Sequence, residues 1–290
     1  MDGFIVLNKE PNMTSFDCVA KCRGIFKTKQ VGHTGTLDPM TTGVLVIALN
    51  KATKLMELTL DKKKKYYAQV LVGIQTDMLD ITGKITEQEN IEEINLELLK
   101  EKILELSKTT TQIPPMYSAI KVNGKKLYEY ARQGITIERK PRDIHIDYID
   151  LKSDIYKEDG HLRFEIEVMA DSGIYIRSLI DDLGKLMGVP MTMSKLQRSQ
   201  SGDYKVEDSY TLDDCRNGNY KLVTIEEIFK HTPFIEVNDF HAKLVKNGVM
   251  LDQRQAKFDE IFRVYHNNKL IALFKPHTKG NYKIIVYLGD

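Results

Sequence analysis

Cysteine is scarce in this chain of 290 residues, and none of the three cysteines is placed to staple the fold. Cys18, Cys22 and Cys215 are too few and too scattered for a disulfide framework. The pair at 18 and 22 also lacks a second pair of ligands at zinc spacing. We therefore expect three ordinary buried thiols.

Long apolar runs are also missing. No uninterrupted apolar segment approaches twenty residues, which excludes a membrane-spanning helix, and the N-terminal MDGFIVLNKE lacks the basic and then apolar layout of a secretory signal. We expect a cytoplasmic protein without a membrane partner. With 42% apolar residues, the chain can bury a full core as one large domain or as a large domain and a small one.

Net charge is nearly absent, at +1, so the overall balance points to no particular partner. The distribution of charge is more informative. Residues 1–65 carry 11 Lys or Arg against 6 Asp or Glu, and residues 121–142 carry 7 against 2, with Tyr128 and Tyr130 among them. Basic segments that contain aromatic rings suit a polyanion with bases that can stack, although a single such run is more often a solvated surface.

Hydrophobic periodicity predicts a mixture of strands and helices. Strands are expected at 3–9, 44–49, 66–73 and 161–170, and the continuous apolar run at 44–49 is typical of a strand buried on both faces. Helices are expected over 96–107, over 176–187 before Gly188, and after a cap at Thr14 or Ser15, with apolar positions at Phe16, Val19, Ala20 and Ile25. Residues 116–134 predict a strand, an Asn123-Gly124 turn and a short helix, in a candidate mobile loop.

The order of these elements bears on the fold class. Strands and helices alternate irregularly, which indicates an α+β main domain. After residue 232 the pattern changes to short strands at 261–267, 269–276 and 282–288, so we place a domain boundary near Pro233. The residues beyond it would form a small β module near the lower size limit for independent folding.

One stretch, VGHTGTLDPMTTGVLVIAL, places a lone carboxylate, Asp38, between a glycine-bearing turn and Pro39, directly before an apolar strand. Proline fixes its own φ and keeps the preceding residue out of the helical region, so the direction of Asp38 is held. An isolated Asp-Pro is more often a turn in which the carboxylate bonds nearby amides. Here His33 and several threonines flank the acid, which weakens that interpretation.

Three kinds of site could use such a loop. A phosphate-binding loop would end in Lys-Ser or Lys-Thr, which GHTGTLDPMTTG lacks, and a metal site would need ligands that the seven histidines do not supply at ligand spacing. A nucleophilic or base-handling carboxylate needs an apolar pocket, room for a flat substrate and a cation that keeps it ionised. The third kind of site remains.

The same stretch is similar to the signature loop of the TruB type of bacterial tRNA pseudouridine synthases. Other blocks follow in the order of that family: LNKEPNMTSFDCV, KKYYAQVLVGIQTDMLDITG, QIPPMYSAIKVNGKKLYEYAR, the PR at 141–142, GIYIRSLIDDLG and LQRSQSGDY. The resemblance covers about residues 2–210. The segments FIEVNDFHAKLVKNG and LIALFKP resemble, less specifically, the small RNA-binding domain of the PUA type in that family.

The resemblance implies a fold, a reaction and a partner. The fold would be the pseudouridine synthase fold in residues 1–232, α+β with a mixed, largely antiparallel sheet decorated with helices and loops, and a β-barrel-like PUA-type domain in 233–290. The reaction would be isomerisation of uridine to pseudouridine at position 55 in the T loop of tRNA, by base flipping, without a cofactor or metal. The partner would be the T arm of tRNA, clamped by the basic loop 121–142, and we expect a monomer.

The resemblance also implies roles for individual residues. Asp38 would be the nucleophile, acting at ribose C1′, at base C6 or through a glycal; Arg177 would keep it ionised, and Tyr66 would stack on the uracil and take the C5 proton. His33 would enter the RNA where the target base has left. The remaining candidates are Tyr175 and Leu196, which would line the uracil pocket, and Lys9, Lys64, Arg132 and Arg142, which would contact phosphates.

Alternatives remain open at this point. Arg177 could instead pair with Asp181 on its own helix, a contact worth only about 0.2–0.5 kcal/mol. A core aromatic on a strand fits Tyr67, which alternation sends to the face opposite Tyr66. Two other functions also remain, an RNA-binding or RNA-folding protein on the same scaffold without the chemistry, and a nucleotide-processing hydrolase built on the GTLDP loop.

Overall fold

The computed structural model describes residues 1–59, 63–278 and 280–289. The chain forms two compact units, the first from residues 1–39, 45–60 and 207–290 and the second from 40–44 and 61–206. Strand β3 (Thr42–Leu49) contributes residues to both units. The predicted boundary near Pro233 divides the chain differently and stays a prediction.

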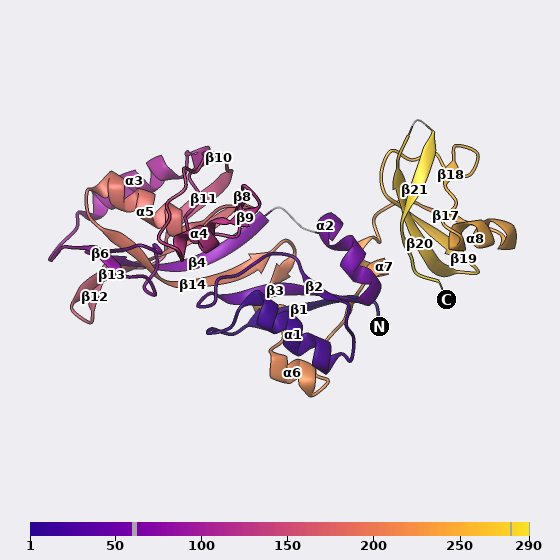
Figure 1. Cartoon of the computed structure of the whole chain (residues 1–290), viewed down its shortest axis with the longest axis horizontal. Helices are drawn as coiled ribbons and strands as arrows, with labels where there is room; N and C mark the ends of the chain where they lie inside the picture. The colour runs from indigo at the N-terminus through magenta and orange to yellow at the C-terminus, as the bar shows by residue number, and fades with distance from the viewer. Residues whose placement is uncertain (60–62, 279, 290) are drawn as a thin grey trace. The chain divides into compact units, whose positions relative to one another are not determined.

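The N-terminal part of the first unit is a small sheet with helices packed on it. Strand β1 (Gly3–Lys9) lies between β3 and β16 (Val223–Thr224), and β2 (Val31–His33) pairs antiparallel with residues 47–49 of β3. Helices α1 (Ser15–Ile25) and α6 (Leu212–Arg216) contact each other (Figure 1). The shorter helical elements of this part are η1 (Asn50–Leu55), α2 (Met56–Thr59) and α7 (Ile225–Ile228).

Helix α1 begins as predicted but buries a different face. The Thr14 hydroxyl accepts the N–H of Asp17 (3.0 Å) and the Asp17 carboxylate accepts the N–H of Thr14 (2.8 Å), which is a reciprocal capping box. Phe16 and Ala20 are exposed, contrary to an apolar face built on them. The buried side is formed by small residues, because thiols pack in cores as apolar groups do: Ser15, Cys18, Val19 and Cys22.

The three thiols are free and buried, as predicted. Burial raises the pKa of Cys22 to about 12 and that of Cys215 to about 11. Within the residues that the structure describes, no helix has both the length and the apolar character needed to cross a bilayer.

The C-terminal part of the first unit is a second sheet, in the order β17-β19-β20-β21-β18. Strand β17 runs parallel to β19, and the other pairs are antiparallel. Its elements are β17 (Phe234–Glu236), α8 (Asp239–Lys246), β18 (Leu251–Asp252), β19 (Phe262–His266), β20 (Lys269–Pro276) and β21 (Asn281–Tyr287). This sheet has a core of its own around Phe262 and Phe274, and it is compatible with a PUA-like module. Strands β19 to β21 were predicted, whereas β17, β18 and α8 were not.

The second unit is built on a sheet in the order β11-β13-β4-β14, which the first residues of β3 continue. These strands are β4 (Lys63–Val72), β11 (Ile146–Leu151), β13 (His161–Asp171) and β14 (Met191–Ser201). Their mutual pairs are antiparallel, and β14 runs parallel to β3. Helices α3 (Leu96–Leu106) and α5 (Ile176–Met187) pack on one face of this sheet (Figure 1). The predicted mixed, largely antiparallel α+β architecture is confirmed.

Local sequence explains several details of the second unit. Strand β13 alternates buried and half-buried residues along its whole length, and α5 ends at Gly188, which adopts a left-handed φ of 69°. The predicted strand, turn and short helix are β8 (Lys121–Val122), β9 (Lys125–Lys126) and α4 (Leu127–Ala131), joined by Asn123 and Gly124 at positive φ. The other short elements are β5 (Ile74–Thr76), β6 (Ile85–Gln88), β7 (Thr111–Gln112), β10 (Arg142–Asp143), β12 (Tyr156–Glu158), β15 (Tyr204–Lys205) and η2 (Val206–Asp208).

Candidate active site

In the first unit, the backbone on both sides of Asp38 is held. Leu37 exchanges two hydrogen bonds with the hydroxyl of Ser15 at the start of α1: its N–H donates to Oγ (2.8 Å), and the hydroxyl donates to its carbonyl (3.2 Å). The carbonyl of Pro39 accepts a hydrogen bond from Nζ of Lys9, the last residue of β1 (3.0 Å). The half-buried Asp38 therefore sits on a segment that a helix and a strand fix in place.

Lys9 and Lys64 were expected to contact phosphates, but both side chains are buried. Lys9 is 0% exposed, and its Nζ also donates to the carbonyl of Glu10 (2.9 Å). A buried ammonium group is costly unless it is hydrogen-bonded, so these carbonyls account for its position. Lys64 on β4 is also buried. A lysine near the end of a strand is usually exposed, and only the tertiary packing reverses that expectation here.

His33 ends strand β2 and opens the loop that carries Asp38. It is half-buried, and its Nδ1 accepts the N–H of Gly35 at 3.3 Å. The next residue, Thr34, donates its N–H to the carbonyl of Val46 on β3 (3.0 Å). These two hydrogen bonds fix the path of the loop where it leaves β2.

In the second unit, the guanidinium of Arg177 is held by groups from other segments. Arg177 is 5% exposed and lies in the first turn of α5. Its Nη1 donates to the carbonyl of Met78 (2.8 Å), and a terminal nitrogen also donates to the carbonyl of Tyr117 (2.9 Å). Nη1 lies 3.7 Å from Oδ2 of Asp80, which is buried as well. These contacts fix the orientation of a cation that is always charged.

Asp80 was not among the site residues predicted from the sequence. Its Oδ1 accepts the N–H of Thr82 (2.9 Å), and the N–H of Ile81 donates to the carbonyl of Met193 on β14 (3.0 Å). The loop that carries Asp80 is therefore attached to the sheet. The sequence signal was its place within a block that resembles the TruB type, just before the turn at Thr82 and Gly83.

Tyr66 lies on β4 between Val168 of β13 and Arg198 of β14. Its ring packs against the core of the second unit, and its hydroxyl is hydrogen-bonded to the guanidinium of Arg198. Nε of Arg198 donates to the carbonyl of Val44 (2.8 Å). Burial lowers the pKa of Arg198, which is 2% exposed. A second buried guanidinium, which sequence reasoning missed, thus holds the phenol of Tyr66.

Tyr67 points to the face of the sheet opposite Tyr66. The prediction that Tyr67 is the core aromatic residue of this strand was wrong. Its hydroxyl donates to the carboxylate of Glu165 on β13, and this hydrogen bond, more than burial, raises the pKa of Tyr67 to about 12. The aromatic ring in contact with the core is that of Tyr66. Strand alternation separated the two rings correctly, but it did not say which face carries the core.

Gln112 on β7 neighbours both Tyr175 and Arg142. The N–H of Tyr175 donates to Oε1 of Gln112 (2.9 Å), and Nε2 of Gln112 donates to the carbonyl of Tyr175 (3.1 Å). Arg142 is exposed on β10, directly opposite Gln112 on β7. Leu196 is buried on β14, opposite Ala68 of β4, in the core that Tyr66 contacts.

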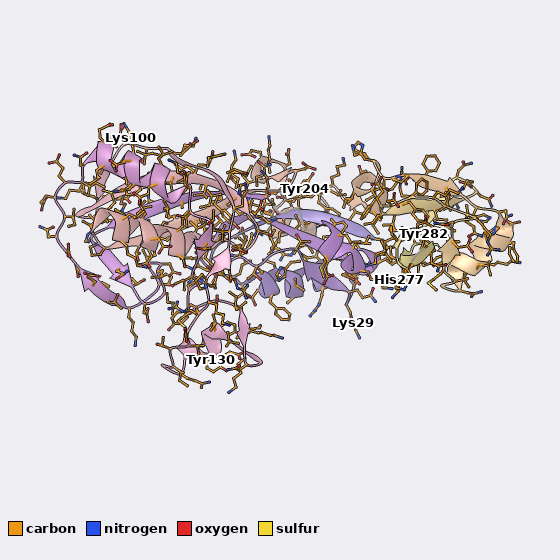
Figure 2. All side chains as sticks on the ribbon, turned by 90° about the horizontal axis from the view of Figure 1, so that it is seen from above. Lys29, Lys100, Tyr130, Tyr204, His277 and Tyr282 are labelled. Atoms are coloured by element: carbon orange, nitrogen blue, oxygen red, sulfur yellow. The ribbon has the colours of Figure 1, made fainter. Side chains whose placement is uncertain are left out.

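The basic segment 121–142 pairs its aromatic rings with its own cations. The ring of Tyr128 lies 5.4 Å from Nζ of Lys126 and 5.3 Å from the guanidinium carbon of Arg132. The ring of Tyr130, labelled in Figure 2, lies 5.9 Å from Nζ of Lys125. Cation–π contacts of this kind hold exposed cations in place. Arg132 is therefore exposed and positioned.

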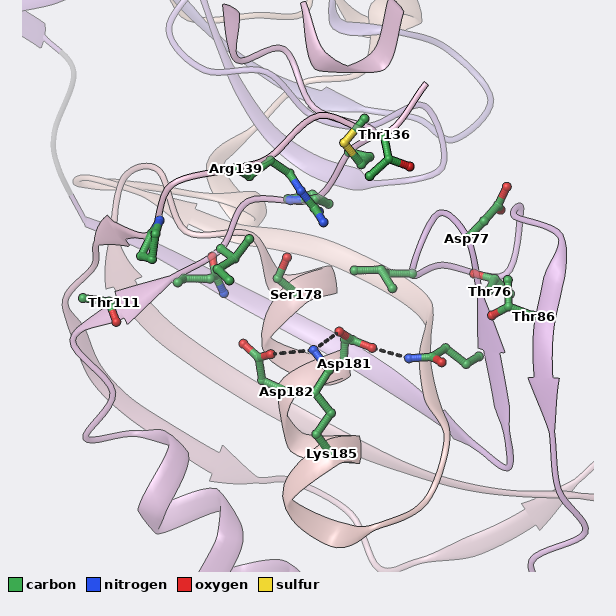
Figure 3. A pocket seen from close by; sticks show the side chains of 17 residues that line it. Thr76, Asp77, Thr86, Thr111, Thr136, Arg139, Ser178, Asp181, Asp182 and Lys185 are labelled. Atoms are coloured by element: carbon green, nitrogen blue, oxygen red, sulfur yellow. Dashed lines mark hydrogen bonds and ion pairs between the residues drawn. The ribbon is translucent and has the colours of Figure 1, made fainter. Parts of the chain in front are cut away.

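A pocket of about 630 Å³ opens beside α5 in the second unit (Figure 3). Asp181 lies on its wall, pairs with Lys185 (2.6 Å) and accepts a hydrogen bond from Gln75. The alternative in which Arg177 pairs with Asp181 is therefore wrong. None of the predicted site residues lines this pocket. Within the described residues, no group of three or more His, Cys, Asp or Glu side chains is arranged to hold a metal ion.

The structure thus assembles two sets of predicted residues. Asp38, His33 and Lys9 belong to the loop and strand ends of the first unit. The others belong to the second unit, where Tyr66 and Leu196 share one core and Arg177 is fixed beside Asp80.

Two solved structures share this fold. A chain of the H/ACA RNP bound to a substrate RNA containing 2′-deoxyuridine matches with a TM-score of 0.66 at 22% identity, over 98% of this chain and 83% of that chain. A chain of the Cbf5-Nop10-Gar1 complex matches with the same TM-score at 24% identity, over 99% and 84%. These likenesses establish the fold alone.

Sequence relatives define the family. The model described as TruB family pseudouridylate synthase (N terminal domain) matches residues 23–176. The tRNA pseudouridine synthase B of Bacillus pumilus is 40% identical over 97% of this chain and 95% of its own length, and that of Bacillus licheniformis is 43% identical over 95% and 93%. The chain belongs to the TruB family of pseudouridylate synthases.

Proposed function

We propose that this protein isomerises uridine to pseudouridine in tRNA, at position 55 of the T loop. Membership of the TruB family and the name tRNA pseudouridine synthase B of the Bacillus relatives support the reaction and the substrate. The observation that carries the residue assignment is the double attachment of the loop around Asp38, to Ser15 and to Lys9. A carboxylate that attacks one atom of a substrate must be held in place before the reaction.

The reaction exchanges one bond to the ribose for another. The bond between ribose C1′ and uracil N1 breaks, a bond between C1′ and C5 forms, the proton on C5 leaves and N1 gains a proton, so no oxidant, reductant or cofactor is needed. The Asp38 carboxylate acts as the nucleophile at C1′ or at C6, or the reaction passes through a glycal. Tyr66 stacks on the uracil and takes the C5 proton, with its hydroxyl oriented by Arg198. Arg177 supplies the positive charge that keeps the nucleophile ionised.

The remaining residues handle the RNA. Extruding a base costs a few kcal/mol of stacking, and the imidazole of His33, inserted at the vacated position, offsets part of that cost. Tyr175 and Leu196 line the uracil pocket. Phosphate contacts fall to the exposed Arg132 and Arg142, because Lys9 and Lys64 are buried.

The proposal extends to the organisation of the chain. Residues 1–232 carry the chemistry, the basic segment 121–142 closes on the T arm, and residues 233–290 add RNA contacts as a PUA-like domain. The protein acts as a monomer in the cytoplasm, where its substrate is found.

The test is release of tritium from C5 of uracil in an unmodified tRNA transcript, compared between the wild type and Asp38→Asn. We expect release and a single pseudouridine at position 55 with the wild type, and loss of at least about three orders of magnitude with Asp38→Asn, as for removal of a nucleophile. The matched control is Asp259→Asn, an exposed acid of the same unit. A transcript with cytidine at position 55 should release no label.

Two results would contradict the proposal. Release by Asp38→Asn at the wild-type rate would remove the assigned nucleophile. Tight tRNA binding by a wild type that releases no label would favour an RNA-binding protein without the chemistry.

A further inference from the structure

The pocket of about 630 Å³ beside α5 carries an excess of negative charge that the proposed reaction does not use. Its charged lining consists of three acids and two cations: Asp77, Asp181, Asp182, Arg139 and Lys185. Figure 3 shows Asp77 and Asp182 on different sides of the pocket. The volume falls in the range of about 300–1,000 Å³ that is usual for sites of small molecules. The pocket therefore has the size of a ligand site and favours a cation.

One buried polar group faces this pocket without a partner. Ser178, in the first turn of α5, is 4% exposed and lines the pocket, and Figure 3 shows its hydroxyl pointing into it. Among the residues that the structure describes, this hydroxyl has no hydrogen-bond partner. A buried hydroxyl without a hydrogen bond is costly. An occupant of the pocket that hydrogen-bonds the hydroxyl removes that cost.

On α5, one lysine serves two carboxylates. Nζ of Lys185 lies 2.6 Å from Oδ2 of Asp181 and 3.2 Å from Oδ1 of Asp182. The other oxygen of Asp181 accepts a hydrogen bond from Gln75, whereas Oδ2 of Asp182 has no partner in the described part of the chain. Burial raises the pKa of Asp182, because it disfavours the charged form of the carboxyl group. A second cation beside Oδ2 would compensate this carboxylate.

Other parts of the pocket wall are already held in place. The hydroxyl of Thr76 donates to the carbonyl of Asp80 (2.6 Å), and Nη1 of Arg139 donates to the carbonyl of Pro114 (3.0 Å). A wall that is ordered before binding spares part of the entropy that a ligand must otherwise overcome. The pocket therefore does not have to form around its ligand.

We propose that this pocket binds a linear polyamine. One ammonium group of the ligand bonds Oδ2 of Asp182 and the hydroxyl of Ser178. A second ammonium group lies beside the exposed carboxylate of Asp77, whose Oδ1 accepts the N–H of Lys84 (2.8 Å). The methylene groups between them pack on the apolar part of the lining, which consists of Leu79, Ile113, Pro115, Met116 and Pro141.

Other small ligands fit this lining less well. Within the described residues, no group of three or more His, Cys, Asp or Glu side chains is arranged to hold a metal ion. An anion could approach Arg139, but it would also face the three carboxylates of the pocket. An ammonium group offers three donors and no acceptor, which suits carboxylate and hydroxyl oxygens. The inference does not depend on the proposed function, in which Ser178, Asp77 and Asp182 have no role.

The test is isothermal titration calorimetry of the full-length protein, free of tRNA, with spermidine as the probe. The wild type is compared with Ser178→Ala and Asp182→Asn. The matched control is Asp154→Asn, an exposed acid of the same unit that does not line the pocket. Magnesium chloride and adenosine monophosphate are titrated as a divalent cation and an anionic ligand. The melting temperature of each protein is measured without ligand.

We expect the wild type to bind one spermidine, and Asp182→Asn to bind it at least about tenfold more weakly, as for loss of a charge-assisted hydrogen bond. Ser178→Ala should bind it about three- to tenfold more weakly. Its melting temperature should stay within about 1 °C of the wild type, because the hydroxyl has no partner to lose. The control should bind spermidine as the wild type does. Weaker binding at unchanged stability separates a ligand contact from a folding defect.

Absence of spermidine binding by the wild type would overturn the inference, as would equal affinities of the wild type and both pocket variants. An equal loss of affinity in the Asp154→Asn control would show general attraction to acidic groups, which also overturns it. Tighter binding of adenosine monophosphate or magnesium than of spermidine, lost in the pocket variants, would assign the pocket to another ligand. Formation of pseudouridine enters none of these results, so the proposed function stands or fails separately.

Discussion

Nη1 of Arg177 lies 3.7 Å from Oδ2 of Asp80, and both side chains are more than nine-tenths buried. We expect Asp80→Asn to remove the negative charge of this ion pair while leaving the two carbonyls that also hold Arg177. Turnover of tRNA should fall by at least about tenfold and the free energy of unfolding by about 1–3 kcal/mol. Single-turnover kinetics and urea unfolding measure the two effects.

The matched control for this prediction is Asp77→Asn, an exposed acid three residues earlier in the same loop. It should change neither turnover nor tRNA affinity. If Asp80→Asn instead weakens tRNA binding and leaves the rate of the bound complex intact, Asp80 acts on the RNA and not through Arg177.

Adjacent tyrosines on β4 offer a paired test of the site. Tyr66→Phe removes the hydroxyl that Arg198 holds, and we expect turnover to fall by about 10²- to 10⁴-fold while tRNA binding persists. Tyr67→Phe removes the hydrogen bond to Glu165, so it should leave turnover unchanged and lower the free energy of unfolding by about 0.5–1.5 kcal/mol. Equal activity of the two variants would contradict the assignment of Tyr66.

Substitution of Lys9 tests whether this lysine is structural or binds phosphate. Lys9→Met keeps most of the volume but leaves the carbonyls of Glu10 and Pro39 without this donor, so the free energy of unfolding should fall by about 1–3 kcal/mol. Turnover should fall with it, since Pro39 follows Asp38. The salt dependence of tRNA binding should not change.

Arg142→Gln should have the opposite effects. Its stability should be normal, and the slope of log K against log salt for tRNA binding should be reduced by about 0.7–0.9.

The buried thiols predict an alkaline loss of stability. The pKa of Cys22 is raised to about 12 in the folded chain, against an ordinary value near 9, because burial disfavours the thiolate. The folded state therefore keeps a proton that the unfolded state releases, and this contribution is complete below about pH 9 and is lost between about pH 9 and 12. Urea unfolding from pH 7 to 11 should show a flatter pH dependence in Cys22→Ala than in the wild type.

The same burial governs reactivity. At pH 8 the native chain should react with a thiol reagent far more slowly than the urea-unfolded chain, because only the thiolate attacks. Rapid labelling of Cys22 in the native protein would show that α1 and α6 separate readily.

Features that depend on local chemistry were predictable from the sequence. The alternation on β13, the turn at Asn123 and Gly124 and the end of α5 at Gly188 follow from periodicity and from residues suited to positive φ. Local pattern also limited the cap of α1 to Thr14 or Ser15, and the structure has it at Thr14. It failed on the buried face of the same helix, because Cys18 and Cys22 pack like apolar residues there.

The support of the site depends on contacts between distant parts of the chain. Ser15 and Leu37 are 22 residues apart, and Lys9 and Pro39 are 30 apart. Neither contact can be recognised from hydrophobic periodicity, because periodicity describes neighbours within one helix or strand. The partners meet only when the sheet and α1 assemble. The pairing of Tyr66 with Arg198 likewise needs the register of β4 on β14.

The attachment of Leu37 and Pro39 through their backbone groups has a consequence for redesign. Since neither of these anchors uses the side chain at position 38, that side chain can be exchanged while both anchors persist. Glutamate, cysteine or serine placed there would start from the same main-chain path, so their reactivities with a uridine substrate could be ranked as differences in reach and basicity alone.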